Sequence, residues 1–275
     1  MSYTSILTHV QTAPEAQARL RCARNLAERF NAVLIGVGVE MVPPLAIGAG
    51  AGPVQADWYA AVSASIEENL KVAETMFWQA AEGLAKGALW KRGLAFPREA
   101  LAAAARSADL IVADRGPHNH KSDYRDAGAA ELAVSAGRPV LVPPPEAPTL
   151  AGKNVVLAWK DTREARRAMS DAMPFLKGAE HVLVTEVCHH YEEADAQARV
   201  DDVALALKRH GVSVEGRAIV HSGAASHEIL RQASLFNADL IVAGAYGHTR
   251  VGEWLFGGVT QELLEQKDHY VLLSH

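Results

Sequence analysis

The sequence predicts an α/β protein in which one unit occurs twice in tandem, each copy built on a parallel sheet with helices on both faces. Three observations predict this class. The hexapeptide ADLIVA at residues 108–113 recurs letter for letter at residues 238–243, 130 positions later, and such internal repetition marks a repeated structural unit. Strand-like and helix-like patterns alternate within each half. The strand-like runs are short and apolar, which is typical of strands buried on both faces of a sheet.

Each copy contains five runs that are expected to be strands. In the first copy they lie near residues 5–9, 33–39, 89–95, 110–113 and 140–142. In the second copy they lie near residues 155–159, 182–187, 213–220, 240–243 and 270–273. Amphipathic, alanine-rich stretches separate them, such as residues 163–175 and 194–210, and these are expected to be helices.

The first copy is longer than the second. Its first helical pattern leads to Val33 and the matching pattern leads to Val182, an offset of 149, which exceeds the hexapeptide offset by 19. Residues 43–53 lack periodicity and are rich in Pro and Gly, so much of this insertion is expected to be a surface loop. Residues 143–148 contain four prolines and predict a stiff, extended linker. The expected domains are residues 1–145 and residues 151–275.

Composition excludes several classes of function. The net charge is -5, no block of Lys or Arg stands out, and aromatic residues are only 6% of the chain, all of which argues against a nucleic-acid partner. The first residues do not form a secretory signal, and no apolar run reaches the ~18 residues of a membrane span. We therefore expect a cytoplasmic protein with no membrane partner. Cys22 and Cys188 are interpreted as buried thiols, because two isolated cysteines form neither a disulfide framework nor a zinc site.

A glycine-rich segment follows the fourth strand of the second copy and precedes a helix expected over residues 261–266. It contains Gly244, Gly247, Gly257 and Gly258. Glycines let the backbone approach a ligand closely, and free amides at a helix start bind anions. Ligands of open α/β sheets bind beyond the carboxyl ends of the strands. Phosphates would be held here, although glycines in a loop also simply make turns. No Gly-Lys-Ser/Thr follows, so this is not a Walker A loop, and it follows the fourth strand rather than the first, so it is not the dinucleotide fingerprint.

The spacing of three of these glycines resembles a family signature. Gly244, two residues, Gly247, nine residues and Gly257 resemble the G-2x-G-9x-G-(S/T) signature of the ATP-binding universal stress proteins. The strings GAYGHTRVGEWLFGGVTQELL at 244–264 and LAWKDTREARRAM at 157–169 resemble that family's fourth-strand region and first strand-helix junction. The resemblance implies two tandem Rossmann-like (adenine nucleotide alpha hydrolase-like) domains, each a five-stranded parallel sheet of order 3-2-1-4-5. It also implies ATP, AMP or ADP as the ligand, with Mg²⁺ as an optional companion of the nucleotide.

The resemblance also implies which residues of the second copy bind. Phosphates and ribose would lie against Gly244, Gly247, Gly257, Gly258, Val259 and Thr260. Adenine would lie between the first and second strands, near Ala158 and Val187. Gly258 replaces the hydroxyl residue of the signature, which Thr260 is expected to supply instead. Lys160 stands where the family has an Asp, and either contacts phosphate as a point charge or points to solvent. His248 either reaches a phosphate or ribose oxygen or is solvated.

The first copy departs from this pattern. Asp114 stands where the second copy has Gly244, and a carboxylate there repels phosphate. Nothing matches Gly257, and Val10 offers no acid at the end of the first strand. We expect this copy to bind no nucleotide in the same way and to act as a partner domain. The resemblance implies that the fifth strands meet, at residues 140–142 and 270–273, in an internal pseudo-dimer, with a further homodimer expected.

The residues single out no catalytic group. The run at residues 188–193 contains metal-capable side chains, but no tetrahedral set emerges at ordinary spacing, so no metal site is expected. Trp159 and Trp254 are interpreted as packing residues. The leading hypothesis is a tandem universal stress protein that binds ATP or another adenine nucleotide in its second domain, with a regulatory role in the stress response. The alternatives are a nucleotide-free scaffold that binds a partner protein, and a slow ATP hydrolase.

Overall fold

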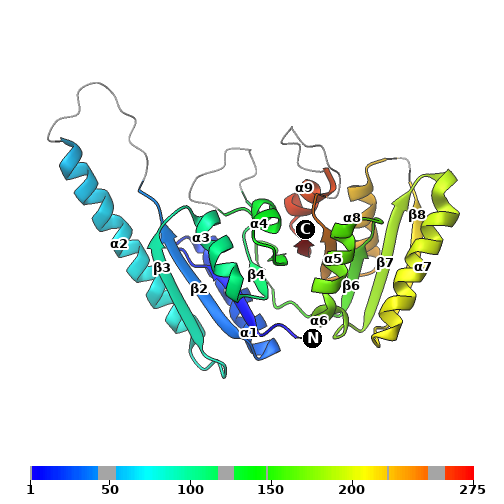
Figure 1. The fold of residues 1–275 in the computed structure, drawn as a ribbon, viewed down its shortest axis with the longest axis horizontal. Helices are drawn as coiled ribbons and strands as arrows, with labels where there is room; N and C mark the ends of the chain where they lie inside the picture. Colours follow the sequence, from blue (N-terminus) through cyan, green and yellow to red (C-terminus); the bar gives the residue numbers. More distant parts are fainter. Residues whose placement is uncertain (1, 43–53, 117–126, 147, 222, 247–257) are drawn as a thin grey trace.

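The computed structural model describes residues 2–42, 54–116, 127–146, 148–221, 223–246 and 258–275. Ten strands lie within these residues: β1 (Ser5–His9), β2 (Val33–Glu40), β3 (Ala88–Leu94), β4 (Leu110–Val112), β5 (Val140–Val142), β6 (Asn154–Ala158), β7 (His181–Cys188), β8 (Val214–Val220), β9 (Leu240–Gly244) and β10 (Tyr270–Ser274). They form one sheet in the order β3-β2-β1-β4-β5-β10-β9-β6-β7-β8 (Figure 1). Each half has the expected order 3-2-1-4-5, and its strands are parallel.

The two halves join at their fifth strands, as expected. β5 pairs with β10 in antiparallel fashion, with Leu141 opposite Leu272. Because this pairing uses the inner edge of both half-sheets, β3 and β8 form the two outer edges of the ten-stranded sheet. The halves therefore share one continuous sheet.

Helices cover both faces of the sheet. The described residues form the helices α1 (Pro14–Phe30), α2 (Val54–Ala81), α3 (Pro97–Ala104), α4 (Ala129–Ser135), α5 (Arg163–Asp171), α6 (Met173–Leu176), α7 (Glu193–Arg209), α8 (Ala225–Leu235) and α9 (Gly258–Glu265), together with the 3₁₀ turns η1 (Ala105–Ser107) and η2 (His190–Glu192). Apolar residues of α1, α2, α5, α6 and α7 form the core on one face, and those of α3, α4, α8 and α9 form the core on the other. Each core contains residues from both halves, so both layers run across the junction.

The repeated hexapeptide has the same structural role in both halves. Its Leu110 and Leu240 lie opposite Ile6 and Val155 at the start of each first strand. The aspartate that precedes each leucine fastens the residues before that strand. Asp109 accepts hydrogen bonds from the Thr4 amide at 2.8 Å and hydroxyl at 2.7 Å, and Asp239 accepts one from the Lys153 amide at 3.1 Å.

Three local expectations need correction or fall outside the description. The helix expected over 163–175 is broken into α5 and α6 next to Pro174, because proline lacks the amide that would continue the helical hydrogen bonds. The 143–148 linker is not extended throughout, since it turns at Pro145 and Glu146. The loop expected at 43–53 lies outside the described residues. Part of the extra length of the first copy is helical, because α2 has 28 residues and its counterpart α7 has 17.

An aromatic cluster joins the halves at the amino ends of the strands. Tyr3 and Phe30 of the first half contact Phe175 of the second, with ring centroids 5.5 and 5.3 Å from that of Phe175. The Tyr3 hydroxyl donates to the Asp171 carbonyl at 2.6 Å, and Arg29 lies over both phenylalanine rings. The junction is therefore held by packing at one end of the strands as well as by the β5–β10 ladder.

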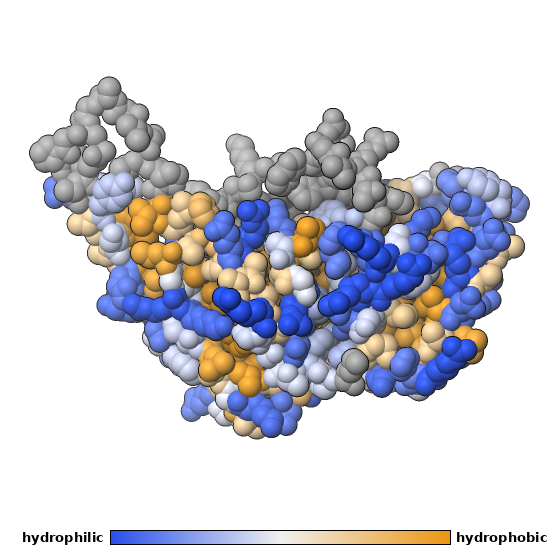
Figure 2. Space-filling view, viewed as in Figure 1, coloured by the Kyte–Doolittle hydropathy of each residue, from blue (hydrophilic) through white to orange (hydrophobic). Residues whose placement is uncertain are grey.

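The surface is mostly polar, with apolar side chains toward the β3 end of the face in Figure 2. Leu89, Leu94 and Phe96 are the exposed large apolar residues of this region. No helix within the described ranges has the length and apolar character needed to cross a membrane. Cys22 and Cys188 are both free and buried, which confirms their interpretation as buried thiols.

Candidate functional site

The carboxyl ends of three strands of the second half come together at one edge of the sheet. Ala158 of β6 lies opposite Thr185 of β7 and Ala243 of β9. Val187 and Gly244 follow in these strands, so they reach the same edge as Ala158. α9 begins at this edge, because the crossover from β9 returns to the start of the parallel strand β10. The structure therefore brings together Ala158, Val187, Gly244 and the start of α9 (Figure 1).

The loop after β6 begins α5 at this edge. Ala158 and Trp159 are buried, and Trp159 belongs to the core, as expected for a packing residue. Lys160 is exposed and makes no ion pair with another described residue. The hydroxyl of Thr162 caps α5 by accepting from the Ala165 amide at 3.3 Å. Both uses foreseen for Lys160, a phosphate contact or a solvated side chain, are compatible with this position.

Gly244 has a packing role that the sequence did not reveal. A Cβ at this position would lie 2.7 Å from the Ala165 amide nitrogen and 2.7 Å from the Glu164 carbonyl carbon, and both are backbone atoms that cannot turn away. The glycine therefore lets the amino end of α5 approach the end of β9. Its contact with a ligand stays a prediction.

At the start of α9 the predicted residues differ in accessibility. Among the described residues, no atom lies within 4 Å of a Cβ placed at Gly258. Thr260, by contrast, is only 4% exposed, and Val259 is half-buried against the core. Gly258, rather than Thr260, is thus the position where a hydroxyl would face open space. Gly247, His248, Gly257 and Trp254 lie outside the described residues.

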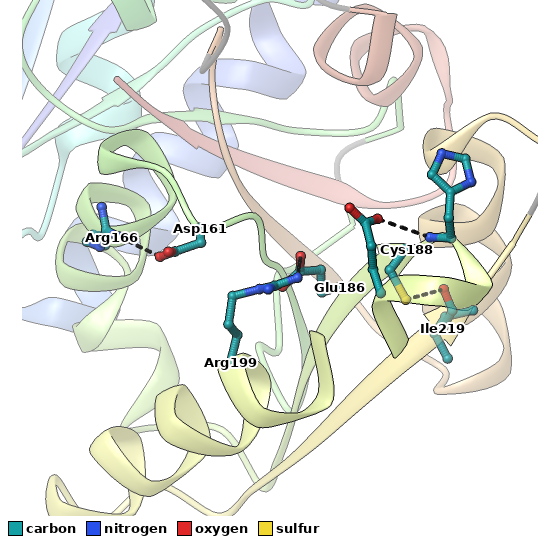
Figure 3. A network of polar contacts seen from close by, with 8 residues as sticks. Asp161, Arg166, Glu186, Cys188, Arg199 and Ile219 are labelled. Carbon is teal, nitrogen blue, oxygen red and sulfur yellow. Dashed lines mark hydrogen bonds and ion pairs between the residues drawn. The ribbon is translucent and has the colours of Figure 1, made fainter. Parts of the chain in front are cut away.

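Figure 3 shows the polar contacts on the α7 side of this edge. Glu186 of β7 is 1% exposed and accepts two hydrogen bonds from Arg199 of α7, at 3.0 and 2.7 Å. These bonds raise the pKa of Arg199 above its ordinary value. Asp161 pairs with Arg166 at 2.5 Å. The carboxylates beside the predicted adenine position are therefore matched by cations.

The metal-capable run at 188–193 serves a local structural role. Glu192 accepts from the His189 amide at 3.4 Å and caps the turn that begins α7. Burial, with the nearby Glu186, raises the pKa of the Cys188 thiol. Within the described part of the chain, no three His, Cys, Asp or Glu side chains are close enough to hold a metal ion.

One polar contact connects α8 with α9 at the same edge, and a second group of contacts lies within α8. Ser226 of α8 donates to Glu262 of α9 at 2.5 Å. Glu228 is 3% exposed, and hydrogen bonds from Arg231, and then from Gln232, lower its pKa. α9 is therefore tied to α8 one turn after its start.

At the equivalent edge of the first half, larger side chains stand where the second half has alanines. Arg19, which is 2% exposed, pairs with Asp114 and donates to the His9 carbonyl at 3.1 and 2.9 Å and to Gln11 at 3.0 Å. Its counterpart in the second half, at the repeat offset of 149, is Ala168. The guanidinium thus occupies space beside the position where the second half has Gly244.

A second difference between the halves also argues against a nucleotide in the first half. His9 is buried at the end of β1, where the second half has Ala158. Burial, together with the nearby Arg19, lowers the pKa of His9 to about 3, so the imidazole is neutral at physiological pH. A ring fills the place beside which adenine is predicted in the second half. Both substitutions support the prediction that the first half binds no nucleotide in the same way.

Sequence reasoning missed two polar groups near the site. Thr185 lies opposite Ala158, is 1% exposed, and its hydroxyl has no hydrogen-bond partner. The sequence does contain a signal for Thr185, because Thr185 and Glu186 are two adjacent polar residues inside the apolar run of β7. Arg115 of the first half reaches the carboxyl end of α9, where it donates to the Leu264 carbonyl at 2.9 Å. No local pattern could have indicated that contact.

The fold and the edge geometry define a tandem, doubly wound α/β protein, and in that class of protein ligands bind beyond the carboxyl ends of the strands. The model of the universal stress protein family matches residues 143–275. The second half of the chain therefore belongs to the universal stress protein family, and the full chain has the fold of a tandem universal stress protein.

Solved structures support the fold over the full length. A universal stress protein from Archaeoglobus fulgidus DSM 4304 is 16% identical, with a TM-score of 0.74 over 98% of this chain and 95% of that chain. A Pseudomonas aeruginosa UCBPP-PA14 protein that carries the universal stress protein name is 18% identical, with a TM-score of 0.60 over 99% and 93%. A Pseudomonas aeruginosa PAO1 protein of unknown function is 16% identical, with a TM-score of 0.58 over 99% and 92%. A search of curated proteins finds no match.

Proposed function

We propose that the protein binds ATP or another adenine nucleotide at the strand ends of its second half and acts as a regulator in the stress response. The observation that carries the proposal is the convergence of Ala158, Val187, Gly244 and the start of α9 at one edge. The amides at a helix start and a nearby cation, here Lys160, favour phosphate. The proposed units are residues 1–145, a partner domain, and residues 151–275, the binding domain.

The contrast between the halves supports the same assignment. Buried Arg19 and His9 lie at the edge of the first half, whereas the corresponding residues of the second half are the smaller Ala168 and Ala158. One nucleotide per chain is therefore expected. The chemistry is binding rather than turnover, with Mg²⁺ accompanying a triphosphate and hydrolysis at most slow.

Mass spectrometry of small molecules released from the purified, denatured protein tests this proposal. Stoichiometric adenine nucleotide, together with a thermal shift on adding ATP and Mg²⁺, is the expected result. Absence of both would overturn the proposal and favour the nucleotide-free scaffold. Time-resolved phosphate release separates binding from hydrolysis.

Gly258→Ser sharpens the test. The described residues leave space for a side chain at this position, so the new hydroxyl is expected to donate to phosphate and to strengthen ATP binding at least about tenfold, the effect of one added hydrogen bond to a charged group. Titration calorimetry with ATP measures the change. Gly93→Ser is the control, since its Cβ also meets nothing within 4 Å and it lies on β3 of the first half. Equal ATP affinity in wild type and Gly258→Ser would place the phosphates elsewhere.

A further inference from the structure

A single arginine of the first half holds the carboxyl end of the helix that begins the proposed phosphate site. Arg115 follows Asp114 after β4, and its guanidinium donates to four backbone carbonyls. These are Pro143 at 3.2 Å, Leu264 at 2.9 Å, Gln266, and His269 at 3.1 Å. The last three belong to the end of α9 and to the loop that leads into β10.

This contact meets a specific physical need. The last carbonyls of a helix have no partner within the helix, and a cation there also favours the helix dipole. Burial lowers the pKa of Arg115 to about 10, with Asp268 opposing the decrease, so the guanidinium stays charged at neutral pH. Gln266 supports the same turn, because its side chain donates to the Leu263 carbonyl at 3.2 Å and accepts from the Asp268 amide at 2.7 Å. The end of α9 is thus fixed from two sides.

The position of the second half that matches Arg115 cannot make the same contact. At the hexapeptide offset of 130, the counterpart of Arg115 in the second half is Ala245, which is fully buried and has no side-chain donor. The first half thus supports the helix of the second, and Ala245 cannot offer the same support to α4.

We infer that Arg115 is a positioning residue for phosphate binding in the second half, an inference that rests on the proposed function. α9 has eight residues and spans about 12 Å, so a shift of its carboxyl end moves its amino end at Gly258. Without Arg115 the carbonyls at the end of α9 lose their donor, and the amides at its start lose their fixed position. Affinity for the phosphate part of a nucleotide falls, whereas affinity for its adenosine part, at β6 and β7, does not.

Two measurements on the full chain test the inference. The first is calorimetric titration of wild type, Arg115→Gln and Arg115→Lys with ATP and with adenosine. We expect Arg115→Gln to weaken ATP binding about tenfold, as for loss of charged hydrogen bonds at a helix end, with adenosine affinity unchanged within about twofold. Arg115→Lys keeps the positive charge but lacks the planar, forked guanidinium, so its ATP affinity is expected to lie between those of wild type and Arg115→Gln.

The second measurement is hydrogen exchange of the amides of α9 without nucleotide. Protection across Gly258–Glu265 is expected to fall about tenfold in Arg115→Gln. The control is Arg138→Gln, which removes a partly buried arginine that donates to the Ala105 carbonyl of its own half at 3.3 Å. This variant is expected to change neither the exchange protection of α9 nor the ratio of the affinities for ATP and adenosine.

The outcomes separate the two proposals. If wild type binds ATP and Arg115→Gln binds it equally well, or loses ATP and adenosine alike, the positioning role is wrong and the proposed function stands. If wild type binds no adenine nucleotide, the proposed function fails and the positioning role fails with it, even where α9 loses protection. Selective loss of ATP affinity together with loss of α9 protection supports both.

Discussion

At the scale of single residues, His9 combines deep burial with a titratable ring. Its pKa is lowered to about 3, chiefly by burial, and its Nε2 has no hydrogen-bond partner. The folded state therefore keeps the ring neutral at pH values where the unfolded chain, with a pKa near 6.5, takes up a proton. The unfolded state binds more protons in this window, so acid favours unfolding.

We expect the free energy of unfolding to fall by about 1.4 kcal/mol for each pH unit between about 6.5 and 3 on account of His9, and to be independent of His9 above that window. Urea denaturation at pH 7.5 and pH 5.0 measures the effect. In the His9→Asn variant, the side-chain amide stands near the ring nitrogen that forms a hydrogen bond with the Val39 backbone. Unlike the imidazole, this amide does not titrate. Its pH dependence should be weaker than that of wild type by about 2 kcal/mol over this interval; identical slopes would contradict the assignment.

Gly244 shows what a residue-level prediction could and could not reach. Its place at the end of the fourth strand followed from the repeated apolar run, and the edge it shares with Ala158 followed from parallel pairing. Its close contact with Glu164 and Ala165 did not, because it depends on the angle at which α5 approaches β9. The same limit applies to Arg115, whose acceptors lie about 150 residues away in sequence and become neighbours only when the halves join.

At the scale of elements, the ion pair between the buried Glu186 and the partly exposed Arg199 connects α7 with β7. Glu186 is 1% exposed, so removal of its partner leaves a carboxylate without compensation in the core. Arg199→Met is expected to lower the free energy of unfolding by about 3 kcal/mol, and the double variant Glu186→Leu/Arg199→Met is expected to recover most of it.

Urea denaturation checks this expectation. The matched control is Arg217→Met, which removes the partner of an exposed pair with Glu215 at the same 2.7 Å separation and should change stability by less than about 1 kcal/mol. If Arg199→Met lowers the free energy of unfolding as little as Arg217→Met does, then water reaches Glu186.

The strands were the best predicted elements, since short apolar runs between breakers define them directly. Each expected strand lies within two residues of the observed one. The helices were less well predicted at their ends. The alanine-rich pattern predicted one helix through Pro174, although proline interrupts the helical hydrogen bonds there. The length of α2 was also not predicted, because the insertion before it is rich in Pro and Gly.

At the scale of the whole molecule, the shared sheet and the two continuous cores predict that the halves unfold together. Phe175 of the second half is fully buried against Tyr3 and Phe30 of the first. Phe175→Ala is therefore expected to destabilise both halves, by about 3 to 5 kcal/mol.

Each half carries one buried cysteine, which provides a natural probe. Labelling of Cys22 and Cys188 by a thiol reagent across a urea series reports the first and second half respectively. Both transitions should shift together in Phe175→Ala, and neither should shift in Leu235→Ala, whose side chain is 65% exposed. Earlier labelling of Cys188 alone would show that the halves unfold as separate units.

The antiparallel ladder between β5 and β10 has a consequence for how such a molecule diverges. Two identical subunits joined across a two-fold axis inherit every substitution twice, so an arginine gained in one loop would remove both ligand loops at once. Two halves on one chain mutate independently. One half can therefore carry Asp114 and Arg115 where the other carries Gly244 and Ala245, and in the proposed arrangement the two halves differ as a binder and its support.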